Sequence, residues 1–289
     1  MKPLDRALSQ QLLTLLRVAL VEEPTNIDHT LFDETTNWNE VCRYASNQGV
    51  LAIAWDGLNI LINKGIIPQT AQPTREIRLR WALSVERLEK RYAKQLKAIG
   101  LLAAIYGDEG ITMTILKGYG LSLCYPTPHH RSCSDVDIWL GGEQQRADSI
   151  LRNKHNIAID EGEHHHTVFY IDGVMVENHY DFINIHAHRS SRIIEQHLKA
   201  QATQSNYEIQ VEHSVVHLPN ANLHALFLLR HAAAHFAGAE IVLRHVIDWA
   251  MFIKHYHKDI DWEWLHRVCH EQGMDHFADA MSTLSLIRI

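Results

Sequence analysis

Two aspartates stand one residue apart in the otherwise apolar run SDVDIWL, residues 134–140. Successive side chains of a β-strand point to opposite faces, so Asp135 and Asp137 share one face while Val136 and Ile138 share the other. Two carboxylates held this close repel each other unless a cation lies between them. Because magnesium and manganese prefer oxygen ligands, the pair predicts a site for Mg²⁺ or Mn²⁺.

A third carboxylate is expected to join this pair from a later strand. In the stretch VMVENHY, Val174 and Val176 suit a buried face, so Glu177 shares the opposite face with His179. Three carboxylates that hold two metal ions are what two-metal phosphoryl or nucleotidyl transfer uses. We therefore predict that the two aspartates and Glu177 are metal ligands and catalytic residues. The alternative for Glu177 is an ordinary exposed acid on a strand.

Positive charge and a glycine precede the aspartates in the chain. Gly118 permits a close approach of the backbone to a ligand, and the helix expected after it offers free N–H groups to a phosphate. Lys117 and Arg131 add cationic groups that can bind phosphate oxygens. We predict that these three residues bind the phosphates of a nucleotide. For Lys117 and Arg131, a plain surface position is an equally good interpretation.

The 22 histidines are the unusual feature of the composition. His231 and His235 have the four-residue spacing of zinc ligands on a helix, but a zinc protease would have glutamate where Ala232 stands. A polar seam that faces Arg244 or Asp248 is the favoured interpretation, and a substrate-facing role stays open. His164 and His166 precede a strand, where alternation puts them on one side. They could line the cleft, although a surface position is favoured.

The elements that must position these residues follow from the hydrophobic pattern. Apolar residues recur every three or four positions after Pro73 and Thr74, which predicts a long helix that begins there. Short β-branched or apolar runs predict strands at 111–118 and 134–140. The dipeptide Asp172–Gly173 between two alternating runs predicts a β-hairpin.

Farther along the chain, a helix capped by Ser190 or Ser191 is expected, then an extended stretch, then helices from residue 220 onward. The chain is thus predicted to be an α+β protein with a mixed β-sheet core and flanking helices. Its expected parts are helical residues 1–98, an α/β core of residues 99–218 and helical residues 219–289.

Charge and cysteine content exclude several classes of protein. The formal charge of −7 and the absence of a dense Lys/Arg block argue against nucleic acid as a partner. No uninterrupted run of 18 apolar residues is present, so no membrane partner is expected. The cysteines form no CxxC pair, which favours a reducing cytoplasm over a disulfide framework; they are Cys42, Cys124, Cys133 and Cys269.

The segment ILKGYGLSLCYPTPHHRSCSDVDIWL resembles the signature of a family of uncharacterised nucleotidyltransferases within the DNA polymerase β-like nucleotidyltransferase superfamily. That superfamily's pattern is a strand, a glycine-containing turn, a short helix, an Asp-x-Asp strand and a later third carboxylate. Gly118, Asp135, Asp137 and Glu177 match these positions in order, and the similarity extends over about residues 80–255.

The resemblance implies a nucleotidyltransferase-type sheet for residues 99–218, an NTP substrate such as ATP, and Mg²⁺ or Mn²⁺ as cofactor. The chain departs from the pattern at Tyr119, where most members of the superfamily have serine or glycine. Lys117 is then expected to substitute in the contact with the triphosphate.

Residues and resemblance together predict transfer of a nucleoside monophosphate from an NTP to a hydroxyl of an unidentified small-molecule or protein acceptor, with release of pyrophosphate. The acidic residues would bind two metal ions, and Glu177 would help to deprotonate the acceptor. The helices after residue 219 would form the other wall of the cleft, as in the antibiotic nucleotidyltransferases that the arrangement resembles.

Two further classes of function stay open. The departure at Tyr119 motivates a catalytically silent module that binds a nucleotide or a protein. A sugar-nucleotide glycosyltransferase also uses Asp-x-Asp with manganese. It would need a nucleotide-binding βαβ region before the motif, whereas residues 1–98 read as helical.

Overall fold

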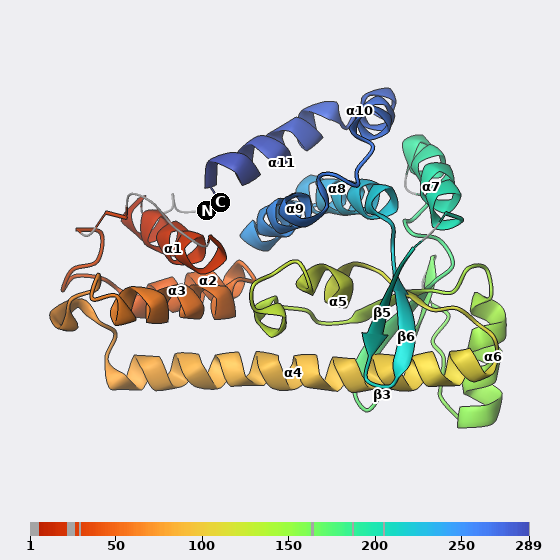
Figure 1. Cartoon of the computed structure of the whole chain (residues 1–289), viewed down its shortest axis with the longest axis horizontal. Coiled ribbons are helices and arrows are strands. Elements are labelled where there is room, and N and C mark those ends of the chain that lie inside the picture. The colour runs from red at the N-terminus through yellow and green to blue at the C-terminus, as the bar shows by residue number, and fades with distance from the viewer. Residues whose placement is uncertain are drawn as a thin grey trace.

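The computed structural model describes residues 6–21, 27–28, 30–162, 165–186, 188–204 and 206–288. Over these residues the chain forms one mixed β-sheet with helices packed around it, so the predicted α+β class is confirmed (Figure 1). The strand order is β3-β4-β2-β1-β6-β5. The strands are β1 (Thr114–Ile115), β2 (Val136–Trp139), β3 (His166–Ile171), β4 (Val174–His179), β5 (Tyr207–Val211) and β6 (Ser214–Leu218).

Strand β2 lies between β1, to which it is antiparallel, and β4, to which it is parallel. The register pairs Val136 with Val176 and Asp137 with Glu177. The two valines are buried in a core with residues of helix α4 (Arg75–Asp108) and helix α6 (Gln144–His155). Alternation therefore directs the paired carboxylates to the opposite face of the sheet.

The β3–β4 hairpin confirms its predicted turn. Asp172 and Gly173 both have positive φ angles, of 48° and 77°, which is the backbone geometry of a two-residue hairpin turn. The expected strand at 111–118 is shorter than predicted, because only Thr114 and Ile115 pair and helix α5 (Lys117–Ser122) begins soon after.

Helix α7 (Arg189–Ala202) begins earlier than its sequence predicted. The residue before its first turn is His188, and no side chain caps it, so the predicted cap by Ser190 or Ser191 is wrong. Ser191 instead lies inside the helix, where it is fully buried and accepts a hydrogen bond from Arg230.

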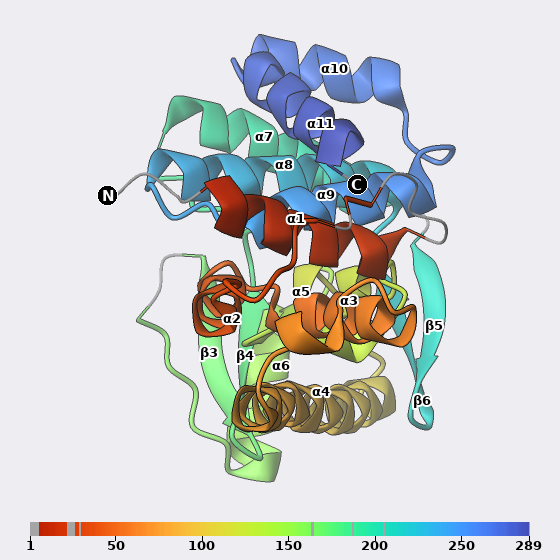
Figure 2. The same ribbon diagram turned by 90° about the vertical axis from the view of Figure 1, so that its left-hand side faces the viewer.

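Helix α4 runs along the whole molecule, beneath both the N-terminal helices and the sheet (Figures 1 and 2). Thr74 caps it as predicted: its hydroxyl accepts the N–H of Ile77 at 3.4 Å. The predicted boundary between residues 98 and 99 falls within this 34-residue helix. The three-part division of the chain therefore stays a prediction.

The N-terminal helices pack around Trp38 and Trp81 of α4, in a core that also includes Ile247 and Met251 near the C-terminus. Gly57 allows two of them to touch, because a Cβ atom there would lie 2.0 Å from the carbonyl oxygen of Leu15. The helices are α1 (Arg6–Leu20), α2 (Trp38–Asn47) and α3 (Leu51–Asn63), followed by the 3₁₀ turn η1 (Gln69–Ala71).

The C-terminal helices cover the side of the molecule opposite α4 (Figure 1). They share a core with Leu116 and Leu121, next to and within α5, and with Phe182, just after β4. These helices are α8 (Ala221–Ala237), α9 (Leu243–Tyr256), α10 (Trp262–Glu271) and α11 (Asp275–Arg288). No helix in the described part of the chain combines the length and apolar character needed to cross a membrane.

Candidate active site

Asp137 and Glu177 face each other across the parallel strands β2 and β4. Together with His179 they form a cluster in which one ligand atom of each residue lies within 4.8 Å of the other two. Asp135 directly precedes β2, and burial followed by the nearby Asp137 carboxylate raises its pKa. The predicted proximity of Glu177 to the aspartate strand is therefore observed, and the structure adds an imidazole to the cluster.

The carboxylate of Asp137 is almost fully buried and has two cationic or hydrogen-bonding partners. Lys117 Nζ lies 2.8 Å from its Oδ1 atom, and His179 Nε2 lies 3.0 Å from the same oxygen. Burial alone raises the pKa of Asp137, but the Lys117 ammonium and then His179 outweigh it and hold that pKa far below its ordinary value. Asp137 is therefore ionised at neutral pH.

His179 lies between the two acids, with only 1% of its surface exposed. Its Nε2 atom is 3.0 Å from Asp137 Oδ1 and 3.3 Å from Glu177 Oε2. Its Nδ1 atom is 3.2 Å from the backbone carbonyl oxygen of Asp181. Burial lowers the pKa of His179, but the hydrogen bonds to the two carboxylates raise it above its ordinary value overall.

Two more histidines from the start of β3 surround this cluster. His166 Nε2 lies 3.9 Å from Glu177 Oε1, and its ring centroid is 5.1 Å from that of His179. The His165 ring is 5.7 Å from His179 by the same measure. The surface position favoured for His166 is wrong, because its side chain is buried against the site. The prediction for His164 lies outside the described residues.

Gly118 packs closely against the loop that precedes β2. A Cβ atom at this position would lie 2.7 Å from Cys133 Sγ and 3.4 Å from the carbonyl oxygen of Asp135. The glycine is therefore required by contact with the chain itself. Lys117 reaches the carboxylates from the first position of α5, and its ammonium also lies 5.3 Å from the Phe227 ring centroid.

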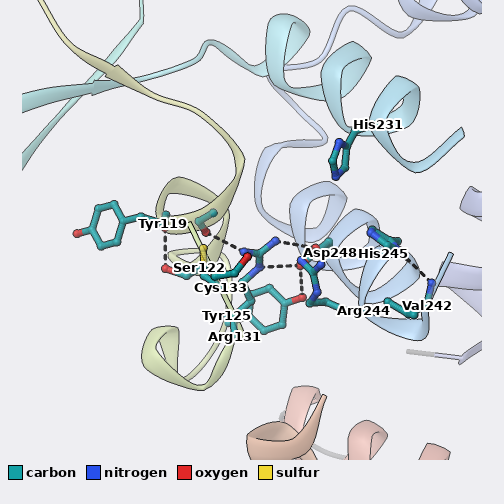
Figure 3. A network of polar contacts seen from close by, with 12 residues as sticks. Tyr119, Ser122, Tyr125, Arg131, Cys133, His231, Val242, Arg244, His245 and Asp248 are labelled. Atoms are coloured by element: carbon teal, nitrogen blue, oxygen red, sulfur yellow. Dashed lines mark hydrogen bonds and ion pairs between the residues drawn. The ribbon is translucent and has the colours of Figure 1, made fainter. Parts of the chain in front are cut away.

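Tyr119, the departure from the superfamily pattern, directs its side chain away from the Arg131–Asp248 pair (Figure 3). Its ring packs in the core of the sheet, 5.8 Å from the ring of Tyr92. The unusual residue is thus accommodated by packing with Tyr92 of α4.

Arg131 is buried and bound to Asp248 of α9 through two hydrogen bonds (Figure 3). Its Nε donates to Oδ1 at 3.0 Å and its Nη2 donates to Oδ2 at 2.8 Å, while Nη1 donates to the carbonyl oxygen of Gly118 at 3.2 Å. Tyr125 and Arg244 also donate to Asp248, at 2.6 and 3.4 Å. This clamp joins the loop before β2 to the C-terminal helices. Its contacts favour a positioning role for Arg131.

The electrostatics of the clamp keep it ionised. Burial raises the pKa of Asp248, but the Arg131 guanidinium outweighs this effect and brings the pKa down to about 2. Burial in turn lowers the pKa of Arg131, while Asp248 raises it above its ordinary value overall. A buried pair with bidentate geometry is the arrangement in which arginine and carboxylate bind most strongly.

A cavity of about 260 Å³ separates the sheet from the C-terminal helices. One wall carries Lys117, Gly118, Asp135 and Asp137, all of them predicted site residues. The other wall belongs to α8 and α9 and carries His231, His235, Arg244, His245 and Asp248, among other residues. The predicted second wall is therefore observed.

The histidines of this second wall contact one another. The Nε2 atoms of His231 and His235 are 3.2 Å apart, and the His235 ring stacks on the ring of His245 with centroids 4.7 Å apart. The Nδ1 atom of His245 accepts the backbone N–H of Val242. Burial, followed by the Lys117 charge, lowers the pKa of His231 to about 2, so its imidazole is neutral.

Sequence reasoning missed two residues of the site. His179 was placed on the face of Glu177 but given no role; its signal was the alternation that identified Glu177. Asp248 was considered only as a neighbour of the histidines. A buried arginine requires an acidic partner, but nothing local in the sequence could identify a residue 117 positions later.

Three solved structures show similarity to this chain, at low sequence identity. Two are structures of ANT(2″)-Ia. One, in complex with adenylyl-2″-tobramycin, has a TM-score of 0.44 and 9% identity and covers 63% of this chain and 99% of that one. The other, a solution structure of this antibiotic-resistance factor, has a TM-score of 0.43 and 12% identity and covers 66% and 95%.

An antigenic nucleotidyltransferase-like protein from Paracoccidioides brasiliensis has a TM-score of 0.40 and 14% identity, with coverage of 65% of this chain and 93% of that one. No curated protein matches the sequence. The sequence profile of the family described as uncharacterised nucleotidyltransferase matches residues 34–285, which include the carboxylate cluster, the clamp and the histidine wall. The chain belongs to this nucleotidyltransferase family.

Proposed function

We propose that the protein transfers a nucleoside monophosphate from an NTP to a hydroxyl group of an acceptor, with release of pyrophosphate. One observation carries this proposal: Asp137 is paired with Glu177 on the neighbouring strand and lines a cavity together with Asp135 and Lys117. Family membership supports the reaction class. A sheet-borne acidic cluster is a rigid support for phosphoryl chemistry, which depends chiefly on positioning and electrostatics.

The donor set fits a divalent metal ion. Carboxylate oxygens of Asp137 and Glu177 converge in a buried position, and the Lys117 ammonium already lies 2.8 Å from Asp137, in the place of a neutralising cation. Asp135, Asp137 and Glu177 would hold Mg²⁺ or Mn²⁺. When bound, the ions supply positive charge to the phosphate oxygens and to the attacking oxygen.

The chain's own groups account for the remaining requirements of the reaction. The acceptor oxygen forms a bond to the α-phosphorus while the bond from that phosphorus to the pyrophosphate oxygen breaks. Glu177 takes the proton of the acceptor hydroxyl, and Lys117 turns from Asp137 toward the phosphates. The cavity wall of α8 and α9 excludes water and contacts the acceptor.

Calorimetric titration of metal and NTP tests the site. Wild type should bind Mg²⁺-ATP or another Mg²⁺-NTP, and Asp137→Asn should reduce that affinity by at least about tenfold, because a ligand charge is lost. The matched control is Asp172→Asn at the exposed β3–β4 turn, where asparagine tolerates the positive φ angle. Equal binding by wild type and Asp137→Asn would refute the metal–nucleotide site.

A transfer assay tests the reaction itself. Each labelled NTP (ATP, GTP, CTP or UTP) is incubated with pools of hydroxyl-bearing small molecules and proteins, including the protein itself. Label on an acceptor together with pyrophosphate release is the expected result, and Asp137→Asn should abolish both. Nucleotide binding without transfer to any pool would instead favour the silent binding module.

A further inference from the structure

Both ring nitrogens of His179 have partners within hydrogen-bond distance, and these partners indicate which atom could bind a metal ion. Nδ1 lies 3.2 Å from the carbonyl oxygen of Asp181, which can only accept a hydrogen bond. Nδ1 must therefore carry a proton. Nε2 is then the nitrogen that faces the carboxylates, and a bound metal ion would take the place of its proton.

This Nε2 atom points at two carboxylate oxygens. Nε2 lies 3.0 Å from Asp137 Oδ1 and 3.3 Å from Glu177 Oε2, and all three residues are shielded from water to a large degree. The two carboxylates need positive charge beside them, which the Lys117 ammonium and the Nε2 proton supply here and which a divalent ion could supply in the place of that proton. Histidines that bind metals are commonly held in this way, with the second ring nitrogen donating to a backbone carbonyl.

We propose that His179 Nε2 is a ligand of the ion bound by Asp137 and Glu177, and that this site therefore prefers the transition ion Mn²⁺ to Mg²⁺. The inference rests on the proposed function, because it names the ion of the same site. Magnesium requires a nearly ideal octahedron of oxygen atoms, whereas first-row transition ions accept imidazole nitrogen.

Two further imidazole side chains lie close to His179. His166 and His165 form a second group with His179 whose ligand atoms also lie within 4.8 Å of one another. The Nδ1 atom of His165 is buried and has no hydrogen-bond partner among the described residues. An all-carboxylate magnesium site would have no use for this set of imidazoles.

The histidine wall is the other candidate position for a transition ion, and its geometry is less suitable. His231, His235 and His245 also offer ligand atoms within 4.8 Å of one another, but the rings of His235 and His245 stack with an angle of 26° between them. His245 Nδ1 accepts the Val242 N–H, which leaves the proton of the neutral ring on Nε2. Variants of this wall therefore provide the control.

Pulsed electron paramagnetic resonance of Mn²⁺-loaded protein detects nitrogen bound to the ion directly. Wild type should show ¹⁴N coupling. His179→Gln should lose it, while the double variant His231→Gln/His235→Gln should keep it. Absence of coupling in wild type, persistence in His179→Gln, or loss confined to the double variant would each overturn the proposal. The wild-type result does not depend on the folding of any variant.

Calorimetry adds a selectivity measurement. His179→Gln should weaken Mn²⁺ binding by roughly 10- to 100-fold. Mg²⁺ binding should change by less than about threefold, because the glutamine amide still offers an oxygen. Equal loss for both ions would overturn the claimed preference. Transfer activity without ¹⁴N coupling would refute this inference alone, whereas ¹⁴N coupling without transfer would refute the proposed function alone.

Discussion

At the scale of single residues, the site is a balance of buried charges. Asp137 stays ionised because Lys117 and His179 offset the cost of its burial, and Asp248 stays ionised because Arg131 does the same across the cavity. Without these partners, burial away from water would favour the protonated form of each carboxylate. The two pairs thus hold fixed charges on both sides of the cavity.

The pH dependence of stability should report on Asp248. Its pKa in the folded protein is about 2, against an ordinary value of 3.8, so its contribution is complete above pH 4 and is lost as the pH falls toward 2. That contribution is on the order of 2 kcal/mol by linkage. Urea unfolding at pH 7, 4 and 3 measures it.

Asp248→Asn provides the comparison, because it leaves the guanidinium of Arg131 buried without its counter-ion. The loss in unfolding free energy should be about 3–5 kcal/mol at pH 7. The difference from wild type should shrink at pH 3, where Asp248 is mostly protonated in the unfolded chain but still mostly ionised in the folded one. A pH-independent difference would show that the charge of Asp248 does not stabilise the fold.

At the scale of elements, the contact of α5 with the loop before β2 sets the position of Lys117. The contact is tight at one point, where Gly118 meets Cys133. Because α5 spans only Lys117–Ser122, a displacement of Gly118 moves Lys117 with it.

Gly118→Ala should therefore destabilise the protein by about 1–3 kcal/mol, as overpacking of a close contact does. The added Cβ would lie 2.7 Å from Cys133 Sγ, so Cys133→Ala should relieve most of the clash in the double variant. Thermal unfolding of the two single variants and the double variant gives the coupling energy. Additive effects would show that the sulfur is not the obstacle.

Elements with local signals could be predicted from the sequence. Thr74 caps its own helix and Asp172–Gly173 makes its own turn, so both were correct. Alternation separated the valines from the acids within each strand, and the structure pairs β2 with β4 as the acids required. The length of β1 and the start of α7 depend on pairing and burial, which the local pattern does not contain.

The site residues also divide into those with a local sequence signal and those that depend on long-range contacts. Strand alternation set Asp137 and Glu177 opposite the buried valines of their own strands. The burial of His166 and the pairing of Arg131 with Asp248 depend on chain segments that meet only in the folded protein. Long-range contacts of this kind leave no periodic trace in the sequence.

At the scale of the whole molecule, the candidate site is shared between the sheet and the C-terminal helices. The cavity has Asp137 on one side and His231 on the other, so a ligand that fills it contacts both halves. Such a ligand binds the folded chain and not the unfolded one.

Nucleotide together with Mn²⁺ should therefore raise the thermal unfolding temperature. At a ligand concentration of about 100 times Kd, the expected stabilisation is about 2.7 kcal/mol. Differential scanning fluorimetry measures the shift, and Asp137→Asn should reduce it while Asp172→Asn should not. An equal shift in Asp137→Asn would place the ligand somewhere other than this cavity.

The Arg131–Asp248 clamp also restricts how the molecule can open. Any motion that separates α9 from the loop before β2 would leave the buried guanidinium and the buried carboxylate without their partners, at a cost of several kcal/mol. The pair is therefore expected to stay closed during turnover and to act as a pivot. A ligand of the cavity would therefore enter and leave while α9 stays attached to the loop before β2.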